Sequence, residues 1–190
     1  AGYSMTANRT PKWRRDYQKK LSDRLAESPD VYDHVVFTEL SVPERTTIAP
    51  PGTVDMVFTF RNVHNWMGGD YAEEMFQVFN RALKPGGVLA LTEHRALPGT
   101  SLAEMKKSGY VTEELVIAMA NKAGFVLEAR SEINANPKDT HDHPAGVWTL
   151  PPGLRHCGKL EGNNKTACEA KYRSIGESDR MTLRFRKPKR

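Results

Sequence analysis

Residues 53–96, TVDMVFTFRNVHNWMGGDYAEEMFQVFNRALKPGGVLALTEHRA, decide the fold. They open with a short apolar run at 54–60, which is typical of a strand buried on both faces of a sheet. From Asp70 the apolar residues follow helical spacing, and the KPGG segment at 84–87 predicts the end of that helix. A second apolar run follows at 88–91. The sequence therefore predicts a right-handed strand–helix–strand unit with two parallel strands.

Polar side chains follow both of these predicted strands. Asn62 and His64 come directly after the first strand, and the second apolar run ends in Glu93 and His94. In parallel sheets, ligands bind outside the carboxyl ends of the strands. We therefore expect Asn62, His64 and His94 to lie on one rim of the sheet.

Four motifs carry a family resemblance, in the order FTFRNVHNW (58–66), LKPGGVL (83–89), NPKDTH (136–141) and LRFRKP (183–188). They resemble the second half of class I S-adenosylmethionine-dependent methyltransferases, and in particular a group of predicted bacterial methyltransferases, many of them exported. The resemblance covers nearly the whole chain. It implies an α/β, Rossmann-like methyltransferase fold with a mostly parallel sheet and helices on both faces.

The glycine-rich loop of that superfamily has no counterpart in the sequence, which contains neither GxGxG nor GxGxxG. Residues 1–8 look like the second strand of the family. We therefore expect one partial domain over residues 1–190 that lacks the first strand, the glycine loop and the first helix. Only glycine allows the backbone to approach the cofactor closely at that turn. This chain alone is thus expected to bind S-adenosylmethionine weakly or not at all, whether it is a fragment or a natural truncation.

Three residues form the candidate catalytic set: His64, Asn62 and His94. Methyl transfer from a sulfonium is an in-line substitution, for which a protein supplies proximity, orientation and sometimes a base. The predicted strand ends place all three side chains against the methyl donor, and a neutral histidine can remove a proton near pH 7. The alternative for His64 is a loop histidine bonded to nearby backbone.

The resemblance also assigns cofactor contacts to Asn8, Glu39 and Arg61. Asn8 lies where many methyltransferases place an acidic residue against the ribose hydroxyls, although an amide offers no charge-assisted hydrogen bond. Glu39 lies near the adenine position of the family, and Arg61 forms part of the pocket wall. Asn8 as a turn residue and Glu39 as a solvent-facing strand end remain alternatives.

Substrate contacts are expected from Trp66 and from a long loop that carries His141 and His143, which could close over the strand ends. The two loop histidines, with Asp139 and Asp142 nearby, could instead bind a divalent metal. Lone HxH matches are common, so no metal ligand is assigned.

Outside the central unit, the sequence predicts further elements. They are a helix at 12–27 with a buried stripe (Trp13, Tyr17, Leu21, Leu25), a strand at 33–40, a helix at 112–123, a strand at 125–132 and a last strand near 181–185. The stretch at about 136–178 reads as a long irregular insertion.

The only two cysteines, Cys157 and Cys168, bracket a polar segment at 158–167. A disulfide closing a loop of this size would stabilise the fold by roughly 2–3 kcal/mol in the chain-entropy model. Such a bond indicates a bacterial periplasmic or secreted protein. Two unrelated reduced thiols in a cytoplasmic protein are the alternative.

Composition limits the partners. The net charge is +5, but the basic residues of the first helix fit a solvated face, and no nucleic-acid-binding motif is present. No stretch approaches the roughly 18 apolar residues of a membrane span. The expected partner is a small-molecule substrate. A second copy of the chain, or a missing N-terminal segment, could complete the sheet.

Three functions are consistent with these features. The first is an S-adenosylmethionine-dependent methyltransferase, which the family motifs favour. The second is a non-catalytic, methyltransferase-like module for binding or assembly, which the absent glycine loop favours. The third is a histidine-based metal-binding protein.

Overall fold

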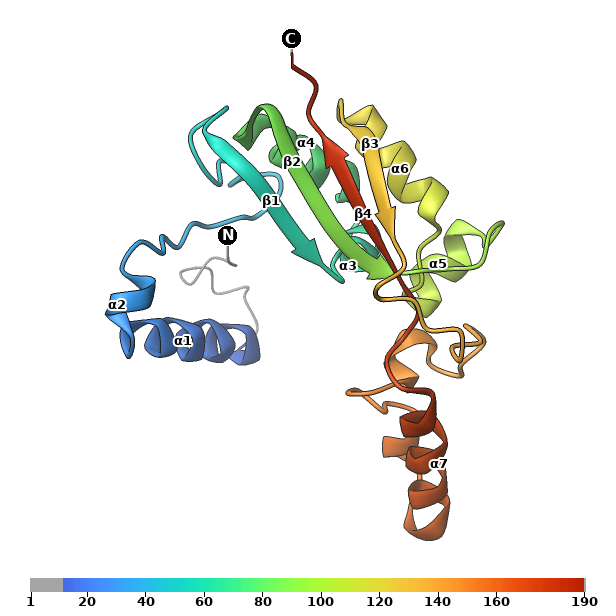
Figure 1. The fold of residues 1–190 in the computed structure, drawn as a ribbon. Coiled ribbons are helices and arrows are strands. Elements are labelled where there is room, and N and C mark those ends of the chain that lie inside the picture. The colour runs from blue at the N-terminus through green and yellow to red at the C-terminus, as the bar shows by residue number, and fades with distance from the viewer. Residues whose placement is uncertain (1–11, 190) are drawn as a thin grey trace.

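The computed structural model describes residues 12–189, so the strand expected at 1–8 lies outside the described residues. Four strands form one sheet in the order β1-β2-β4-β3 (Figure 1). They are β1 (Val54–Phe60), β2 (Leu83–His94), β3 (Val126–Ser131) and β4 (Arg180–Arg186). β1 and β2 are parallel, whereas β4 is antiparallel to both β2 and β3. The predicted α/β class and the parallel strand–helix–strand unit are confirmed.

The helices predicted at 12–27, from Asp70 and at 112–123 are all present in the described residues, together with others. They are α1 (Lys12–Ala26), α2 (Pro29–Tyr32), α3 (Val63–Gly68), α4 (Ala72–Ala82), α5 (Leu102–Ser108), α6 (Glu113–Lys122) and α7 (Gly162–Ile175), with 3₁₀ turns η1 (Gly146–Thr149) and η2 (Cys157–Lys159). α4 is the crossover between β1 and β2, and Thr112 caps α6 through its hydroxyl. Within residues 12–189, no helix is long and apolar enough to cross a bilayer.

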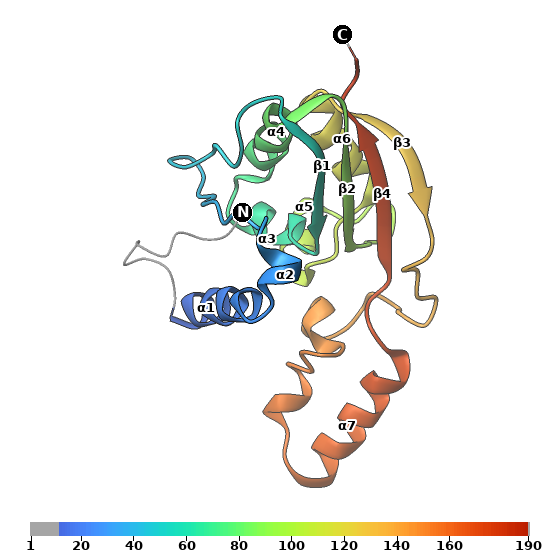
Figure 2. The ribbon, with the colours of Figure 1, turned by 60° about the vertical axis from the view of Figure 1, so that its left-hand side comes forward.

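The main core lies between α4, α6 and one face of the sheet, as both views show (Figures 1 and 2). Phe76 of α4 is fully buried against this face. On the sheet, Leu89 pairs with Phe185 and Leu91 with Leu183, so alternate residues of β2 and β4 enter the same core. Burying each such side chain stabilises the fold by about 1.5–3 kcal/mol.

The other face of β1 is open in the described part of the chain. Met56, Phe58 and Phe60 are 44%, 61% and 59% exposed, and the rings of Phe58 and Phe60 stack with centroids 6.2 Å apart. β1 is also the edge strand of the described sheet. A contiguous exposed apolar surface beside a strand edge is the mark of a contact surface.

Two predictions for the N-terminal segment are wrong. Residues 33–40 form no strand: Val36 is 79% exposed, and Leu40 packs against the main core from a loop. The helix at 12–27 is present as α1, but Tyr17 and Leu21 of its predicted buried stripe are 69% and 51% exposed. α1 stands apart from the sheet in both views (Figures 1 and 2), so Tyr17 and Leu21 do not enter the main core.

Two local boundaries also differ from prediction. The KPGG segment at 84–87 lies within β2, because α4 has already ended at Ala82. The segment at 136–178 is not irregular throughout, since it contains the 14-residue helix α7. α7 is mostly polar and exposed, and therefore lacks the apolar period by which helices are predicted.

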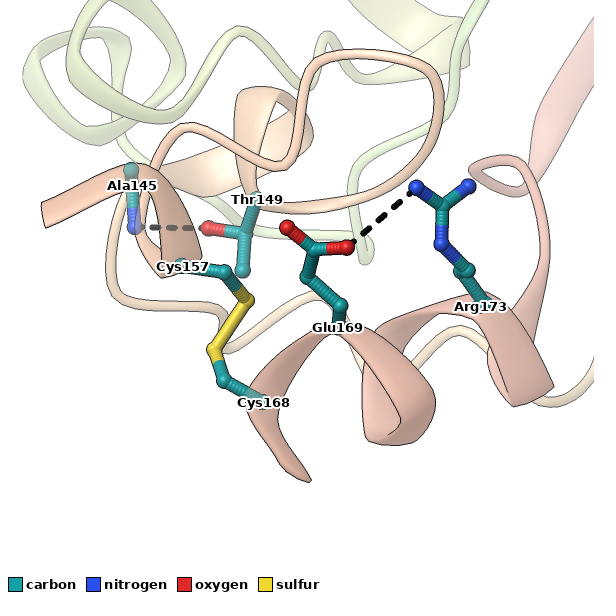
Figure 3. Close-up of a disulfide and its surroundings, with 6 residues drawn as sticks. All are labelled: Ala145, Thr149, Cys157, Cys168, Glu169 and Arg173. Atoms are coloured by element: carbon teal, nitrogen blue, oxygen red, sulfur yellow. Dashed lines mark hydrogen bonds and ion pairs between the residues drawn. A yellow bond between two sulfur atoms is a disulfide. The ribbon is translucent and has the colours of Figure 1, made fainter. Parts of the chain in front are cut away.

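A small second core holds α7 in place. It consists of Leu150, Leu154, Cys157 and Tyr172, with Cys168 and Ile175 packed against it. Cys157 and Cys168 form a disulfide with an S–S distance of 2.07 Å (Figure 3), as predicted. Because so few apolar side chains are buried here, the covalent bond replaces packing as the main restraint.

Replacing both cysteines by alanine should selectively loosen α7. The bond spans 11 positions in sequence, so its loss should lower the local free energy of opening by about 2–3 kcal/mol. Alanine avoids burying a hydroxyl at Cys157, which is fully buried. Native-state hydrogen exchange of α7 amides measures the change, with α6 amides of the main core as the internal control. Unchanged α7 protection would contradict the prediction.

Candidate functional site

Glu93 lies at the carboxyl end of β2, on the core-facing side, and is fully buried. One carboxylate oxygen accepts hydrogen bonds from His64 Nδ1 at 2.9 Å and from the backbone N–H of His94 at 2.8 Å. The other accepts from the backbone N–H of His64 at 3.3 Å. A buried carboxylate requires such partners, and here they join the end of β2 to the first turn of α3.

His64 is oriented by this carboxylate. With Glu93 ionised, Nδ1 carries the proton that is donated, and Nε2 keeps the lone pair. A histidine held in this way by a carboxylate is the usual arrangement of a general base. His64 is 8% exposed, and its ring centroid lies 5.1 Å from that of His94 and 6.0 Å from that of Trp148.

His94 is the second histidine on this rim. Its Nδ1 lies 2.5 Å from Ser178 Oγ, at the start of β4. Burial lowers the pKa of His94 to about 4; Glu93 opposes this shift, whereas the positive charges of Arg61 and Arg180 add to it. His94 is therefore neutral at pH 7.

His64, Glu93 and His94 also lie close enough together for one divalent cation, with ligand atoms within 4.8 Å of one another. In the structure both Nδ1 atoms and both Glu93 oxygens are already hydrogen-bonded. A cation bound through any of these atoms would have to displace those bonds. The arrangement that the structure shows is therefore a hydrogen-bonded His64–Glu93 pair.

A groove of about 660 Å³ lies beside β1. Its lining includes Phe58, Phe60, Asn62, Trp66 and Phe79, whereas His64 and Glu93 do not line it. This volume lies within the usual range for small-molecule sites. Asn62 is partly exposed at the N-cap of α3 and makes no capping bond, so its amide is available to a ligand.

The other predicted residues occupy varied places. Arg61 is exposed directly after β1, with φ +54°, and its backbone N–H donates to Thr92 O at 2.7 Å. Glu39 forms an ion pair with Arg45. Trp66 lines the groove but is 6% exposed, because its ring packs against Phe76 and Phe79.

The two loop histidines lie beyond the rim. The His141 ring is 5.2 Å from that of Tyr110, whereas His143 Nε2 bonds to Asp139 at 2.8 Å. The side chain of this long segment that reaches His64 is that of Trp148. Asn8 lies outside the described residues.

Neither Glu93 nor Trp148 is assigned to the site from the sequence. For Glu93 a signal was present: in an alternating strand it shares the buried face with Leu89 and Leu91. A carboxylate at a core position implies a bonded partner. Trp148 contacts His64 across 84 positions of sequence, and no local pattern predicts such a contact.

The stability of the protein should fall as the pH drops from about 6.5 to about 4 because of His94. In that window the unfolded state binds a proton that the folded state excludes, which costs about 3 kcal/mol when complete. Urea unfolding at pH 7 and pH 4.5 should show a smaller loss in His94→Gln than in the unmodified protein. His34→Gln, at an exposed histidine, should leave the loss unchanged. Equal losses in both variants would contradict the assignment.

Comparison with known proteins identifies the fold. No protein-family model matches the chain, and no curated protein matches it in sequence. Among solved structures, the [4+2]-cyclase SpnF superposes with a TM-score of 0.57 at 16% identity, over 91% of this chain and 63% of the cyclase. A candidate sarcosine dimethylglycine methyltransferase from Galdieria sulphuraria gives a TM-score of 0.57 at 16% identity, over 92% of this chain and 67% of that protein.

The chain thus spans about two thirds of the length of each of these proteins. At such low identity, the likeness shows the fold and not the activity. The strand order, the crossover helix and these superpositions agree: the chain has the Rossmann-like fold of the methyltransferase superfamily that its sequence motifs resemble.

Proposed function

We propose that the protein is an S-adenosylmethionine-dependent methyltransferase that acts on a small molecule, and that residues 1–190 form a partial domain of it. The observation that carries the proposal is the His64–Glu93 pair at the carboxyl end of two parallel strands. That rim is where sheets of this class bind ligands. A histidine oriented by a carboxylate supplies the base that is required when the methyl acceptor is a hydroxyl or amine that still carries its proton.

The chemistry follows from the tautomer of His64. Nε2 takes the proton of the acceptor's hydroxyl or amine, and the freed lone pair attacks the methyl carbon. Bound S-adenosylmethionine would supply the methyl group and would leave as a neutral thioether once its sulfur–methyl bond had broken. Glu93 stabilises the imidazolium that forms, because its carboxylate is already bonded to Nδ1. Neutral His94 and the amide of Asn62 orient the acceptor without adding charge.

The cofactor would lie in the groove beside β1. Asn62 reaches this groove directly, and Arg61 lies next to it at the end of the strand. We assign outer contacts to Asn8 and Glu39 on the family resemblance; Glu39 would first have to leave Arg45. The position of β1 at an edge of the described sheet supports completion of the sheet by a further strand. Binding of S-adenosylmethionine would depend on that strand.

A non-catalytic binding module is the second candidate. The exposed edge and face of β1 favour it, because they suit pairing with another chain, including a second copy. SpnF, described as a [4+2]-cyclase, indicates that this fold also occurs outside methyl transfer. In this reading the His64–Glu93 pair is a structural tie.

We further propose that the protein is periplasmic or secreted. The disulfide between Cys157 and Cys168 supports an oxidising compartment, since such bonds are rare in the cytoplasm. A cytoplasmic location would require these thiols to be reduced in the cell.

Methyl transfer can be tested with S-adenosylmethionine labelled in the methyl group and pooled small-molecule acceptors. The longest natural form of the chain should release S-adenosylhomocysteine, and His64→Asn should lower the rate by about 10²–10⁴-fold with little change in cofactor affinity. His34→Gln is the matched control at an exposed histidine. The 190-residue chain alone should bind the cofactor weakly or not at all in calorimetry.

Two results would separate the candidates. If no form of the chain binds the cofactor, the methyltransferase proposal fails and the binding module is favoured. If turnover survives His64→Asn, the protein is still a methyltransferase, but His64 is not its base.

A further inference from the structure

Asp139 is a second buried carboxylate, at the start of the long segment between β3 and α7, and it is 3% exposed. Both of its oxygens accept from the Tyr110 hydroxyl at 2.9 Å, and one accepts from His143 Nε2 at 2.8 Å. Backbone N–H groups of His141 and Asp179 donate at 3.0 and 2.7 Å. The carboxylate therefore has a full set of donors.

These donors come from three separate parts of the chain. Tyr110 lies between α5 and α6, His143 lies in the same segment as Asp139, and Asp179 precedes β4. Burial and the charge of Asp139 raise the pKa of Tyr110, so its hydroxyl stays a donor at any physiological pH. Asp139 thus ties residues 136–149, here called the cover segment, to the connection between α5 and α6 and to the residues just before β4.

The cover segment rests closely on the end of α5. A Cβ atom at Gly146 would lie 2.0 Å from Ser108 O, and one at Gly109 would lie 2.8 Å from a Val147 methyl carbon. Both glycines also have positive φ, +55° and +77°. The two backbones can approach this closely only because neither position has a side chain.

Trp148 is the side chain that this arrangement delivers to the candidate site. Beyond Asp139 the segment is held by Gly146 N–H donating to His143 O at 2.9 Å. Ala145 N–H also donates to Thr149 Oγ1 at 2.9 Å (Figure 3). The Trp148 ring then stands edge-on to His64, at 6.0 Å. On its other side, the Arg155 guanidinium lies 4.9 Å from the ring.

We infer that Asp139 is a positioning residue, whose buried carboxylate holds the cover segment so that Trp148 packs against the base, His64. Its catalytic meaning rests on the proposed function, whereas the contact itself rests on the geometry. Asp139 does not touch the rim. It acts through the segment, and the cover excludes water from the side of His64 that Trp148 occupies.

Replacement of Asp139 by asparagine should release the cover. An amide presents one oxygen and one NH₂ where four donor groups now converge on two oxygens, so some of these donors would face a donor. The His64–Glu93 bond has no partner in common with Asp139 and should persist. Trp148 should therefore move while the base stays in place.

Fluorine NMR of protein labelled with 5-fluorotryptophan tests this directly, since the chain has three tryptophans. In Asp139→Asn, the Trp148 signal, assigned through Trp148→Phe, should shift and gain a solvent isotope effect. The signal of Trp66, which packs in the main core, should not move. The matched control is Asp142→Asn, the same chemical change at an exposed carboxylate of the same segment. The chemical shift of the His64 ring proton should change together with that of Trp148, because the ring next to it has moved.

The outcomes are separable from the fate of the methyltransferase proposal, because this readout needs neither cofactor nor acceptor. An unmoved Trp148 signal in Asp139→Asn overturns the inference. If the Trp66 signal also moves, the fold has changed, and Tyr110→Phe, which removes only one donor, decides by the same signal. Where turnover is measurable, Asp139→Asn should lower it by about 10²-fold without weakening cofactor binding. Unchanged turnover would refute the positioning role.

Discussion

The carboxylate of Glu93 is the interaction on which the candidate site depends. It stands at the end of the central strand β2 and accepts bonds from both the backbone and the ring of His64. Because α3 follows β1 directly, this one group fixes the end of β1, the start of α3 and the end of β2 relative to each other. Burying a charge costs free energy, and the cost is offset only while every donor is in place. The rim is therefore rigid where the proposed chemistry needs it to be.

The parts of the fold that the sequence predicts correctly are those whose partners are close in the chain or repeat with a clear period. β1, α4 and β2 form such a unit, and α6 with β3 follows the same rule. The predictions of a strand at 33–40 and of a buried stripe on α1 are wrong for the same reason. An apolar pattern states that a residue can be buried, not that the fold buries it, and in the described chain Tyr17 and Val36 are 69% and 79% exposed. For α7 the error is the opposite one: no helix is predicted, because a disulfide and a small core of four buried side chains replace the apolar stripe that the sequence lacks.

The candidate site divides along the same line. His64, Asn62 and His94 could be predicted to share a rim, because parallel strands end at one edge; His64 and His94 do meet there. The role of Glu93 was readable in principle from the alternation of β2. The contacts of Trp148 and Asp139 were not, since they depend on how a segment without a regular period folds over Ser108 and Gly109. The sequence predicts that His141 and His143 close over the strand ends. The side chain of that segment that packs on His64 is that of Trp148.

The two buried carboxylates divide the work of the site. Glu93 bonds only to the residues of the rim, and Asp139 bonds only to the cover segment and its supports, so they share no hydrogen-bond partner. A site held by one network would lose the base whenever the cover opened to admit an acceptor. With separate ties, the bond that sets the direction of His64 does not depend on the bonds that hold Trp148 in place. A fold that also occurs in a [4+2]-cyclase does not by itself specify a reaction. In the proposed function, His64 is an oriented base beneath an independently held cover, and this arrangement suits chemistry that begins with removal of a proton away from water.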